Sequence, residues 1–175
     1  MTSTAISEEA PDTIIMTYSF PSPLITPISL GDNLYHQVII QGAPCSGNPG
    51  EPLLPTKGAY LLLPADTTID SITITGERTQ VGSGLTIVPC GAPVPLIPNA
   101  PEVVPQPDQL LYQSNEEFPG ELFSEVGVYQ FRGYSILVLL LSPVQYIPAT
   151  GDVFYYPSLT ITVSLPKELH ENVMY

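Results

Sequence analysis

The chain has 175 residues, 43% of them hydrophobic, which is enough to bury the core of one or two small domains and excludes a wholly disordered protein. Four basic residues stand against seventeen acidic ones, so the net charge is −13. Nucleic acid and anionic membrane surfaces both attract clustered Lys and Arg, so this balance disfavours both as partners. The longest apolar run, Ile136–Leu141, is far shorter than the ~20 residues that cross a bilayer.

The proline content and the N-terminal segment exclude further classes of structure. The chain contains 21 prolines, more than twice the usual share of ~5%. Each proline inside a helix removes a hydrogen bond and clashes with the preceding turn, so long helices are not expected. Residues 1–12 are predicted to be a flexible acidic tail, and they lack the basic start and apolar stretch of a signal peptide. If the natural protein is exported, its leader has been removed from this chain.

Strand patterns dominate from residue 13 onward. Ile72 and Ile74 alternate with Thr73 and Thr75, which is typical of a half-buried strand. The other segments rich in β-branched and aromatic residues are bounded by Gly and Pro, as strands are. The strands expected in the first half of the chain are 13–20, 34–41, 57–63, 72–75 and 80–88.

The last third has the clearest strand pattern. Strands 126–132 and 134–141 meet at Gly133, and the second is apolar on both faces, which places it in the middle of a sheet. Residues 148–152 form a turn before a strand at 153–156. The final strand alternates strictly, so its odd positions should face the core and its even positions should not. The expected core residues are Leu159, Ile161, Val163 and Leu165, and the expected outer residues are Thr160, Thr162 and Ser164.

These elements predict an all-β fold, an antiparallel β-sandwich or flattened barrel of about nine strands. The only helix expected is a short one near residues 115–118. The predicted sandwich spans residues 13–166 as one domain, and residues 167–175 follow it as a C-terminal linker. No internal repeat of fixed period is present.

The stretch between Pro89 and Pro119 breaks the strand pattern and is predicted to be a long loop. Loops of this length are normally functional or disordered, and dense proline favours an extended backbone that loses little entropy when it binds. The composition fits a peptide presented to another protein and a plain surface excursion equally well. Its prolines are Pro89, Pro93, Pro95, Pro98, Pro101, Pro105, Pro107 and Pro119.

Catalytic and metal-binding patterns are absent from the sequence. Cys45 and Cys90 both lie in turn contexts and are compatible with one disulfide or with two inert thiols. Together with His36 and His170 they match no zinc spacing, and no glycine-rich loop opens a helix to hold a phosphate. The acidic residues are scattered and form no calcium loop. No metal, no cofactor and no enzymatic activity are therefore expected.

Several ordered blocks resemble the N-terminal propeptides of gingipain-like cysteine peptidases. Gly50-Glu-Pro-Leu-Leu-Pro55 looks like the first block of that family, and it is followed by a strand and Leu63-Pro-Ala. Tyr112-Gln-Ser-Asn-Glu-Glu-Phe-Pro-Gly-Glu121 is similar to its acidic segment. Arg132-Gly-Tyr then leads to Pro143-Val-Gln-Tyr-Ile-Pro-Ala-Thr-Gly151, which resembles its last block. The likeness covers roughly residues 50–165.

The resemblance implies a secreted or cell-surface β-sandwich prodomain that assists folding of a following catalytic domain and keeps it latent. In that family a prodomain loop lies across the active-site cleft and offers a side chain to the specificity pocket. The matching loop here is 91–106, and the spacing carries that role to Leu96, or to Ile97 or Asn99 if the loop is slipped. Its flanking residues are Gly91, Pro95 and Pro98.

This sequence departs from the better-known family pattern at the loop. Those peptidases cut after Arg or Lys, yet no basic residue lies between Arg78 and Arg132. Either the partner enzyme prefers another residue, for which Asn99 is a candidate, or latency uses a different contact. Two other functions stay open from the sequence: an extracellular β-sandwich adhesion or surface module without a protease partner, and a small hydrolase that uses Cys45 or Cys90 with a histidine.

Overall fold

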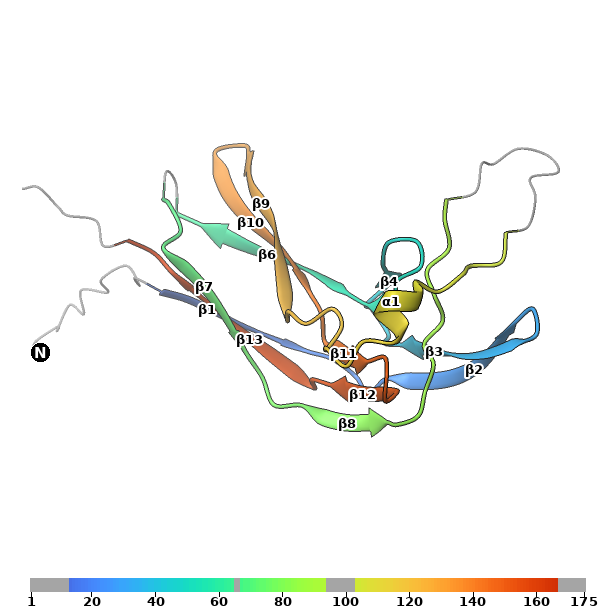
Figure 1. Cartoon of the computed structure of the whole chain (residues 1–175). Helices are drawn as coiled ribbons and strands as arrows, with labels where there is room; N and C mark the ends of the chain where they lie inside the picture. The colour runs from blue at the N-terminus through green and yellow to red at the C-terminus, as the bar shows by residue number, and fades with distance from the viewer. Residues whose placement is uncertain (1–12, 65–66, 94–102, 167–175) are drawn as a thin grey trace, which may run out of the picture.

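The computed structural model describes residues 13–64, 67–93 and 103–166. Nearly all of its regular structure is antiparallel strand, arranged in three three-stranded sheets and two two-stranded ones. Two of the three-stranded sheets form the layers of a sandwich, and the rest extends the molecule to one side (Figure 1). Within the described residues no sheet closes on itself, so the fold is the expected sandwich rather than the flattened barrel. The predicted tail 1–12 and linker 167–175 lie outside the described residues.

The first layer is the sheet β1-β13-β7. It is built from β1 (Thr13–Ser19), β13 (Ser158–Ser164) and β7 (Ser71–Thr75). The strict alternation of β13 decides which face is buried, because successive side chains of a strand point to opposite sides. Leu159, Ile161 and Val163 are fully buried, as the sequence predicts, and Leu165 just beyond the strand is buried as well.

The second layer is the sheet β6-β10-β9. It consists of β6 (Lys57–Leu63), β10 (Tyr134–Leu141) and β9 (Phe123–Phe131), with β10 in the middle as its apolar pattern predicts. A two-residue turn joins β9 to β10, with φ of 51° at Arg132 and 84° at Gly133. Positive φ at both positions is the type of turn that matches the twist of a hairpin.

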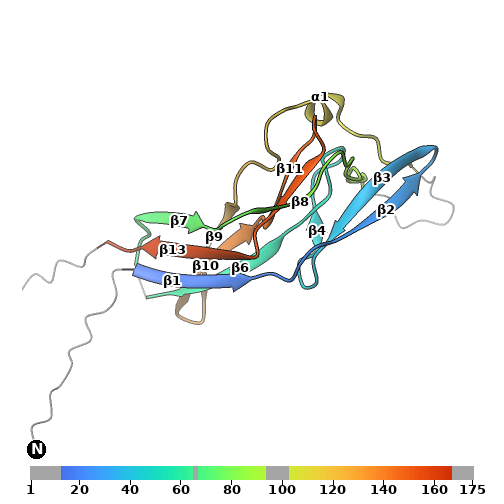
Figure 2. The same cartoon turned by 90° about the horizontal axis from the view of Figure 1, so that it is seen from below.

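The hydrophobic core lies between these two layers, which are stacked when the molecule is seen from below (Figure 2). Ala59, Leu61, Leu137, Leu139 and Leu141 contribute the inner face of the second sheet, and all five are fully buried. They meet the inner face of β13, which buries its odd-numbered residues, and the even-numbered residues of β1 and β7 paired with these lie on the same inner face.

The remaining strands extend the sandwich on the side away from the chain termini. The hairpin β2-β3 is formed by Leu24–Leu30 and Asn33–Ile39, and β4 (Cys45–Ser46) pairs with β5 (Leu54–Pro55). A third sheet is formed by β11 (Val144–Ile147), β12 (Asp152–Tyr155) and β8 (Thr79–Gly82). One turn of helix, α1 (Gln109–Tyr112), precedes β9.

Three sequence-based expectations need correction. The short helix lies at Gln109–Tyr112 instead of 115–118, because Asp108 accepts hydrogen bonds from two backbone amides and so caps it. The strand expected at 80–88 ends at Gly82, since Gly84 adopts a φ of 66° and turns the chain. The strand Leu24–Leu30 was not expected, because Pro27 interrupts its pattern, and a proline is tolerated in a strand only at an edge or a bulge.

Candidate functional site: the proline-rich loop and its anchors

The described ends of the proline-rich loop leave the body at the end opposite the chain termini (Figure 1). The two ends, residues 91–93 and 103–107, are called the loop stems below. They lie close together, since a methyl group added at Gly91 would be 3.3 Å from Cγ of Pro105. Of the six loop residues that the sequence singles out for the specificity pocket and its flanks, the structure describes Gly91. Outside the described residues lie Pro95, Leu96, Ile97, Pro98 and Asn99.

The segment that enters the loop is bonded to residues 47–53, which we call the anchor turn. The amide of Leu53 donates to the carbonyl of Val88 at 2.9 Å, so the pairing begins before the loop does. Cys90 then makes two backbone hydrogen bonds, one to the Glu51 carbonyl at 2.7 Å and one from the Gly50 amide at 2.9 Å. The turn itself is closed by the Asn48 amide, which donates to the Glu51 carboxylate at 2.8 Å.

The segment that leaves the loop is bonded to the same turn. The amide of Asp108 donates to the carbonyl of Gly50 at 2.9 Å, and the Asp108 carboxylate caps α1 immediately afterwards. Gly50 has a φ of 88°, and a methyl group there would lie 3.4 Å from the Asp108 amide nitrogen and from the Gln106 carbonyl oxygen. Glycine therefore allows both stems to approach one turn, and the base of the loop is fixed on both sides.

Two tyrosine hydroxyls hold residues 85–87, which lead into the loop. Tyr146 donates to the Leu85 carbonyl at 2.9 Å, and Tyr112 donates to the Ile87 carbonyl at 2.8 Å. Burial raises the pKa of both phenols, so both remain neutral donors across the physiological range. On the other side, the carbonyl of His36 in β3 accepts from the Val88 amide at 2.9 Å.

A buried glutamine joins two of the blocks that carry the family resemblance, Tyr112–Glu121 and Pro143–Gly151. Gln145 in β11 is fully buried, yet its amide is satisfied: its Oε1 accepts from the Gly120 amide at 2.9 Å and its Nε2 donates to the Glu121 carbonyl at 3.1 Å. Phe118 and Tyr146 exchange two backbone hydrogen bonds beside it. Sequence reasoning assigned no role to Gln145. The signal was a lone amide in the apolar run Val144–Ile147.

A pocket of about 350 Å³ opens next to the anchor turn. Its walls are mainly apolar, and its polar lining side chains are half-buried or exposed. Gly47 and Glu51 of the anchor turn form one side, so the pocket and the loop share a supporting segment. The apolar wall residues are Leu54, Pro55, Phe118, Pro119, Phe123, Leu140 and Val144.

The two cysteines form no disulfide, and the structure gives neither the surroundings of a nucleophile. Each thiol is directed at a different backbone carbonyl: Cys45 donates to Val38 at 3.3 Å, and Cys90 donates to Gly47 at 3.2 Å. Burial raises the pKa of Cys45, whereas a catalytic thiol requires a lowered pKa. His170 lies outside the described residues. The geometry of Cys45 therefore argues against the hydrolase alternative.

Neither a metal-binding cluster nor a membrane-spanning helix is found in the described residues. No group of three or more His, Cys, Asp or Glu side chains in residues 13–64, 67–93 and 103–166 is placed to hold a metal ion. In the same part of the chain no helix is long and apolar enough to span a membrane.

Comparison with known structures supports this fold. The pro- and mature-domain complex of RgpB from Porphyromonas gingivalis is similar with a TM-score of 0.68 and 17% identity, covering 93% of this chain and 84% of that one. A structure concerned with the zymogenic latency of gingipain K from the same organism gives 0.69 and 18%, covering 88% and 87%. No curated protein sequence matches the chain. At these identities the structures establish the fold alone.

The family is established by sequence. The Propeptide_C25 family model matches residues 6–173, almost the whole chain. The match includes the blocks that the anchor turn, Gln145 and Tyr146 bring together, so the family pattern and the anchoring of the loop involve the same residues. It also separates this chain from a general adhesion module. The chain therefore belongs to the Propeptide_C25 family and is a non-catalytic propeptide of a gingipain-like cysteine peptidase.

Proposed function

We propose that this propeptide keeps the catalytic domain of its own cysteine peptidase latent by laying residues 91–106 across the active-site cleft, and that it assists that domain's folding. Leu96 is the residue proposed for the specificity pocket, with Ile97 or Asn99 as the alternative if the loop is slipped. The linker 167–175 leads toward the catalytic domain, and the pair is secreted or held at the cell surface. The relatives whose structures show a pro- and mature-domain complex and zymogenic latency support this proposal.

The anchoring of the stems is the observation that most favours it. A peptide that binds in a protease cleft loses conformational entropy, and this loss weakens its binding. Here the residues that flank the two stems, Cys90 and Asp108, are hydrogen-bonded to one turn, and Tyr112 and Tyr146 fix the segment in front of them. A loop whose base is already fixed loses less entropy on binding than a free strap of the same length.

The charge of the propeptide indicates the charge of the surface that it binds. The net charge is −13, and all three described cations are engaged: Arg78 pairs with Glu117, Lys57 donates to the Gly42 carbonyl, and Arg132 lies over the Phe131 ring. The propeptide therefore presents a predominantly negative surface. A positively charged face on the catalytic domain would be captured faster at low salt than at high salt.

The test is inhibition of the catalytic domain encoded downstream in the same gene by the separately produced propeptide. Residual activity is followed on peptides that differ in the residue before the cut, at low and high salt. We expect tight inhibition by the wild type and a large loss of inhibition for the triple variant Leu96→Gly/Ile97→Gly/Asn99→Gly. The peptide class that is cut best then indicates which of the three side chains enters the pocket.

The matched control is Thr162→Ala, which changes an outward side chain of β13 far from the loop stems. It should inhibit like the wild type. Inhibition by the triple variant equal to that of the wild type would rule out the loop assignment, and no inhibition by the wild type at high excess would rule out latency itself.

A further inference from the structure

The outer face of the sheet β6-β10-β9 is apolar along its whole length. The register pairs Tyr134 with Phe131 at the hairpin end, Ile136 with both Leu62 and Tyr129 below it, and Val138 with Tyr60. Residues paired directly across antiparallel strands share a face. All positions of this face are Gly58, Tyr60, Leu62, Ser124, Gly127, Tyr129, Phe131, Tyr134, Ile136, Val138 and Leu140, and none is charged.

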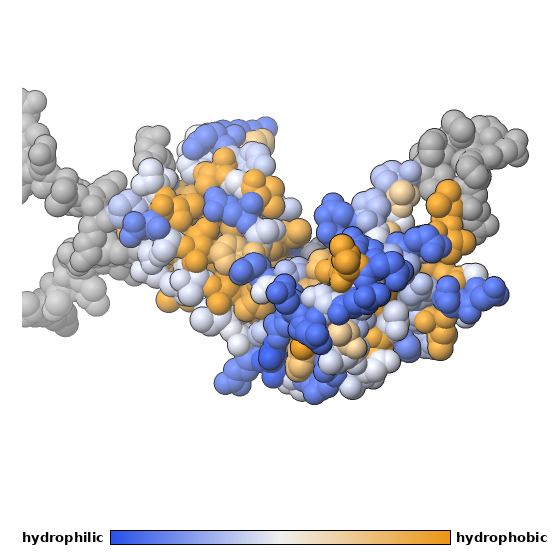
Figure 3. Space-filling model, in the orientation of Figure 1, coloured by the Kyte–Doolittle hydropathy of each residue, from blue (hydrophilic) through white to orange (hydrophobic). Residues whose placement is uncertain are grey.

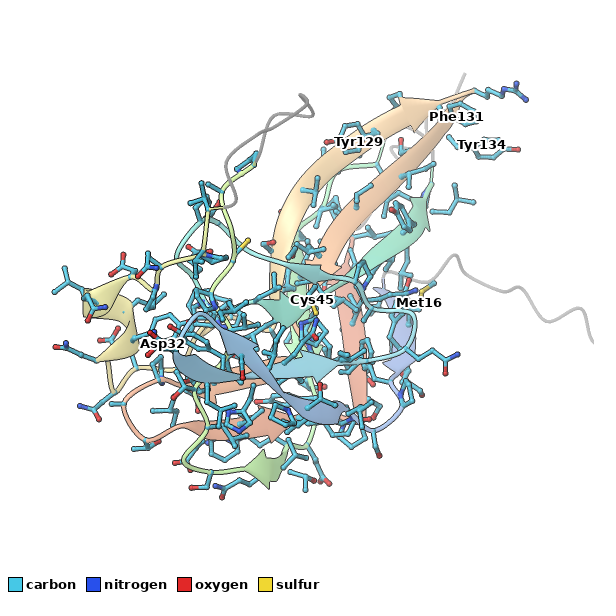
Figure 4. All side chains as sticks on the ribbon, turned by 90° about the vertical axis from the view of Figure 1, so that its right-hand side faces the viewer. Met16, Asp32, Cys45, Tyr129, Phe131 and Tyr134 are labelled. Atoms are coloured by element: carbon cyan, nitrogen blue, oxygen red, sulfur yellow. The ribbon has the colours of Figure 1, made fainter. Side chains whose placement is uncertain are left out.

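Five large side chains of this face are more than half exposed. Tyr60, Leu62, Tyr129, Phe131 and Tyr134 have exposed fractions between 52% and 65%. Three of them project from the hairpin in Figure 4. Contiguous exposed apolar surface of this kind marks an interaction site, because a solvated face of a sheet normally carries polar side chains.

The rings of Tyr60 and Tyr129 lie over neighbouring glycines of the sheet. A methyl group at Gly58 would be 3.1 Å from the Tyr60 hydroxyl, and one at Gly127 would be 3.5 Å from the Tyr129 ring. Each ring therefore covers a glycine two residues earlier on the same face. The outer surface is a nearly continuous apolar layer, and Arg132 lies at its hairpin end with its guanidinium 5.3 Å from the centre of the Phe131 ring.

This face continues into the pocket beside the loop. Leu140 and Ser124 are paired at its lower end, and both line the pocket, whose far side is formed by Gly47 and Glu51 of the anchor turn. Figure 3 shows the hollow between the hydrophobic hairpin and the lobe with the loop stems. A partner that meets the loop at its base thus also faces the pocket and the sheet.

We propose that this apolar face and the pocket form a second docking surface for the catalytic domain of the peptidase, which places an apolar side chain in the pocket. The proposal rests on the function proposed above, in which that domain is the partner of the propeptide. It adds that a part of the affinity resides on β6, β9 and β10, outside the loop.

Charge argues for the catalytic domain over a second copy of this chain. Two copies would each bring a net charge of −13 to the contact, and a single basic side chain at the described face, Arg132 over the Phe131 ring, is too little to compensate the repulsion. The same charge favours a partner of opposite sign.

The experiment measures the dissociation constant of the full propeptide for the catalytic domain, for the wild type and for Leu62→Thr/Tyr129→Thr. Threonine suits a strand and removes the apolar contact. Buried apolar anchors of an interface are worth about 30-fold or more in affinity, so we expect at least ~30-fold weaker binding. The matched control is Ile15→Thr, because Ile15 is an equally exposed aliphatic side chain on the other sheet, and it should change the constant less than ~2-fold.

A second variant tests the pocket at the end of the face and leaves the large apolar side chains of the face unchanged. Ser124→Tyr places a large side chain at the pocket mouth on an exposed edge strand and should also weaken binding, while the unfolding midpoint stays that of the wild type. Wild-type inhibition with unchanged affinity in both variants would overturn the second surface and leave the loop intact. Absence of any wild-type binding would overturn the proposed function. A concentration-dependent dimer of the wild type that Leu62→Thr/Tyr129→Thr abolishes would assign the face to a second copy instead.

Discussion

The two sheets of the sandwich are alike on the inside and opposite on the outside. The outer face of β1-β13-β7 carries Ser or Thr at every paired position except Ile15, and two of these, Thr17 and Thr160, share a hydrogen bond of 2.9 Å. The outer face of β6-β10-β9 is aromatic and aliphatic. Both inner faces are fully buried at their centres. The core requires only that apolar residues occupy the inward positions of each strand, so it does not fix the residues of the outer face. The composition of an outer face therefore indicates what that face contacts, which is water in the first sheet and another protein in the second.

The largest effect should come from comparing the two sides of one sheet. Leu139 is fully buried on the inner face of β10, and Leu139→Ala should lower the free energy of unfolding by roughly 2–5 kcal/mol through lost contacts and a cavity. Leu62→Ala on the outer face of β6 should change it by only about 0.5 kcal/mol. Urea unfolding of both variants measures the contrast. Equal losses would mean that the outer face is packed within the propeptide itself.

Next in size is the attachment of β11 to the segment that leads into β9. Gln145→Leu keeps the volume but leaves the Gly120 amide and the Glu121 carbonyl without their partner, which should cost roughly 1–3 kcal/mol of unfolding free energy. The control is Gln80→Leu, since Gln80 in β8 is exposed and its amide donates to the Asp152 carboxylate at the surface, so its loss should cost about 1 kcal/mol or less. If Gln145→Leu is no less stable than the control, the hydrogen bonds of Gln145 do not hold residues 120 and 121 in place.

Alkaline unfolding should report on the tyrosines at the loop entrance. Burial raises the folded-state pKa of Tyr112 and Tyr146 above the ordinary value of 10.0, so their contribution to stability is complete below pH 10 and is lost as the pH rises above it. The free energy of unfolding should therefore fall above pH 10. Tyr112→Phe should make that fall shallower and should cost about 1 kcal/mol at neutral pH, because the bond to the Ile87 carbonyl is lost. Denaturant titrations from pH 8 to 11 measure both, and an unchanged slope would contradict the assignment.

The sequence predicted the layers of the sandwich better than the anchors of the loop. Lys57–Leu63 and Tyr134–Leu141 were expected with their observed bounds, and β13 within one residue at each end, because period-2 alternation and apolar runs are local signals. Apolar residues on both faces of β10 correctly predicted a central strand. They did not reveal that its outer face is uncovered, since exposure depends on which element packs above a sheet.

The site was predictable only in part, for a related physical reason. The loop is visible as a run of prolines, but its support comes from contacts between residues far apart in the sequence, such as Gly50 with Asp108 and Gln145 with Gly120. No local pattern encodes such contacts. The helix was misplaced for the same reason that it is short, because a single capping side chain, Asp108, decides where it starts.

The smallest expected change in stability belongs to the outer faces themselves, and there the comparison is sharpest. Leu62→Thr and Ile15→Thr each remove one exposed aliphatic side chain, one from each sheet, and both should stay within about 0.5 kcal/mol of the wild type. A dye that fluoresces on apolar surfaces should distinguish them. Leu62 belongs to a continuous apolar face, so Leu62→Thr should reduce the dye signal, whereas Ile15 is surrounded by hydroxyl side chains and Ile15→Thr should not. Equal signals would mean that the exposed residues of β6, β9 and β10 behave as separate surface side chains, and composition alone would then no longer distinguish the sheet that faces water from the sheet that faces a partner.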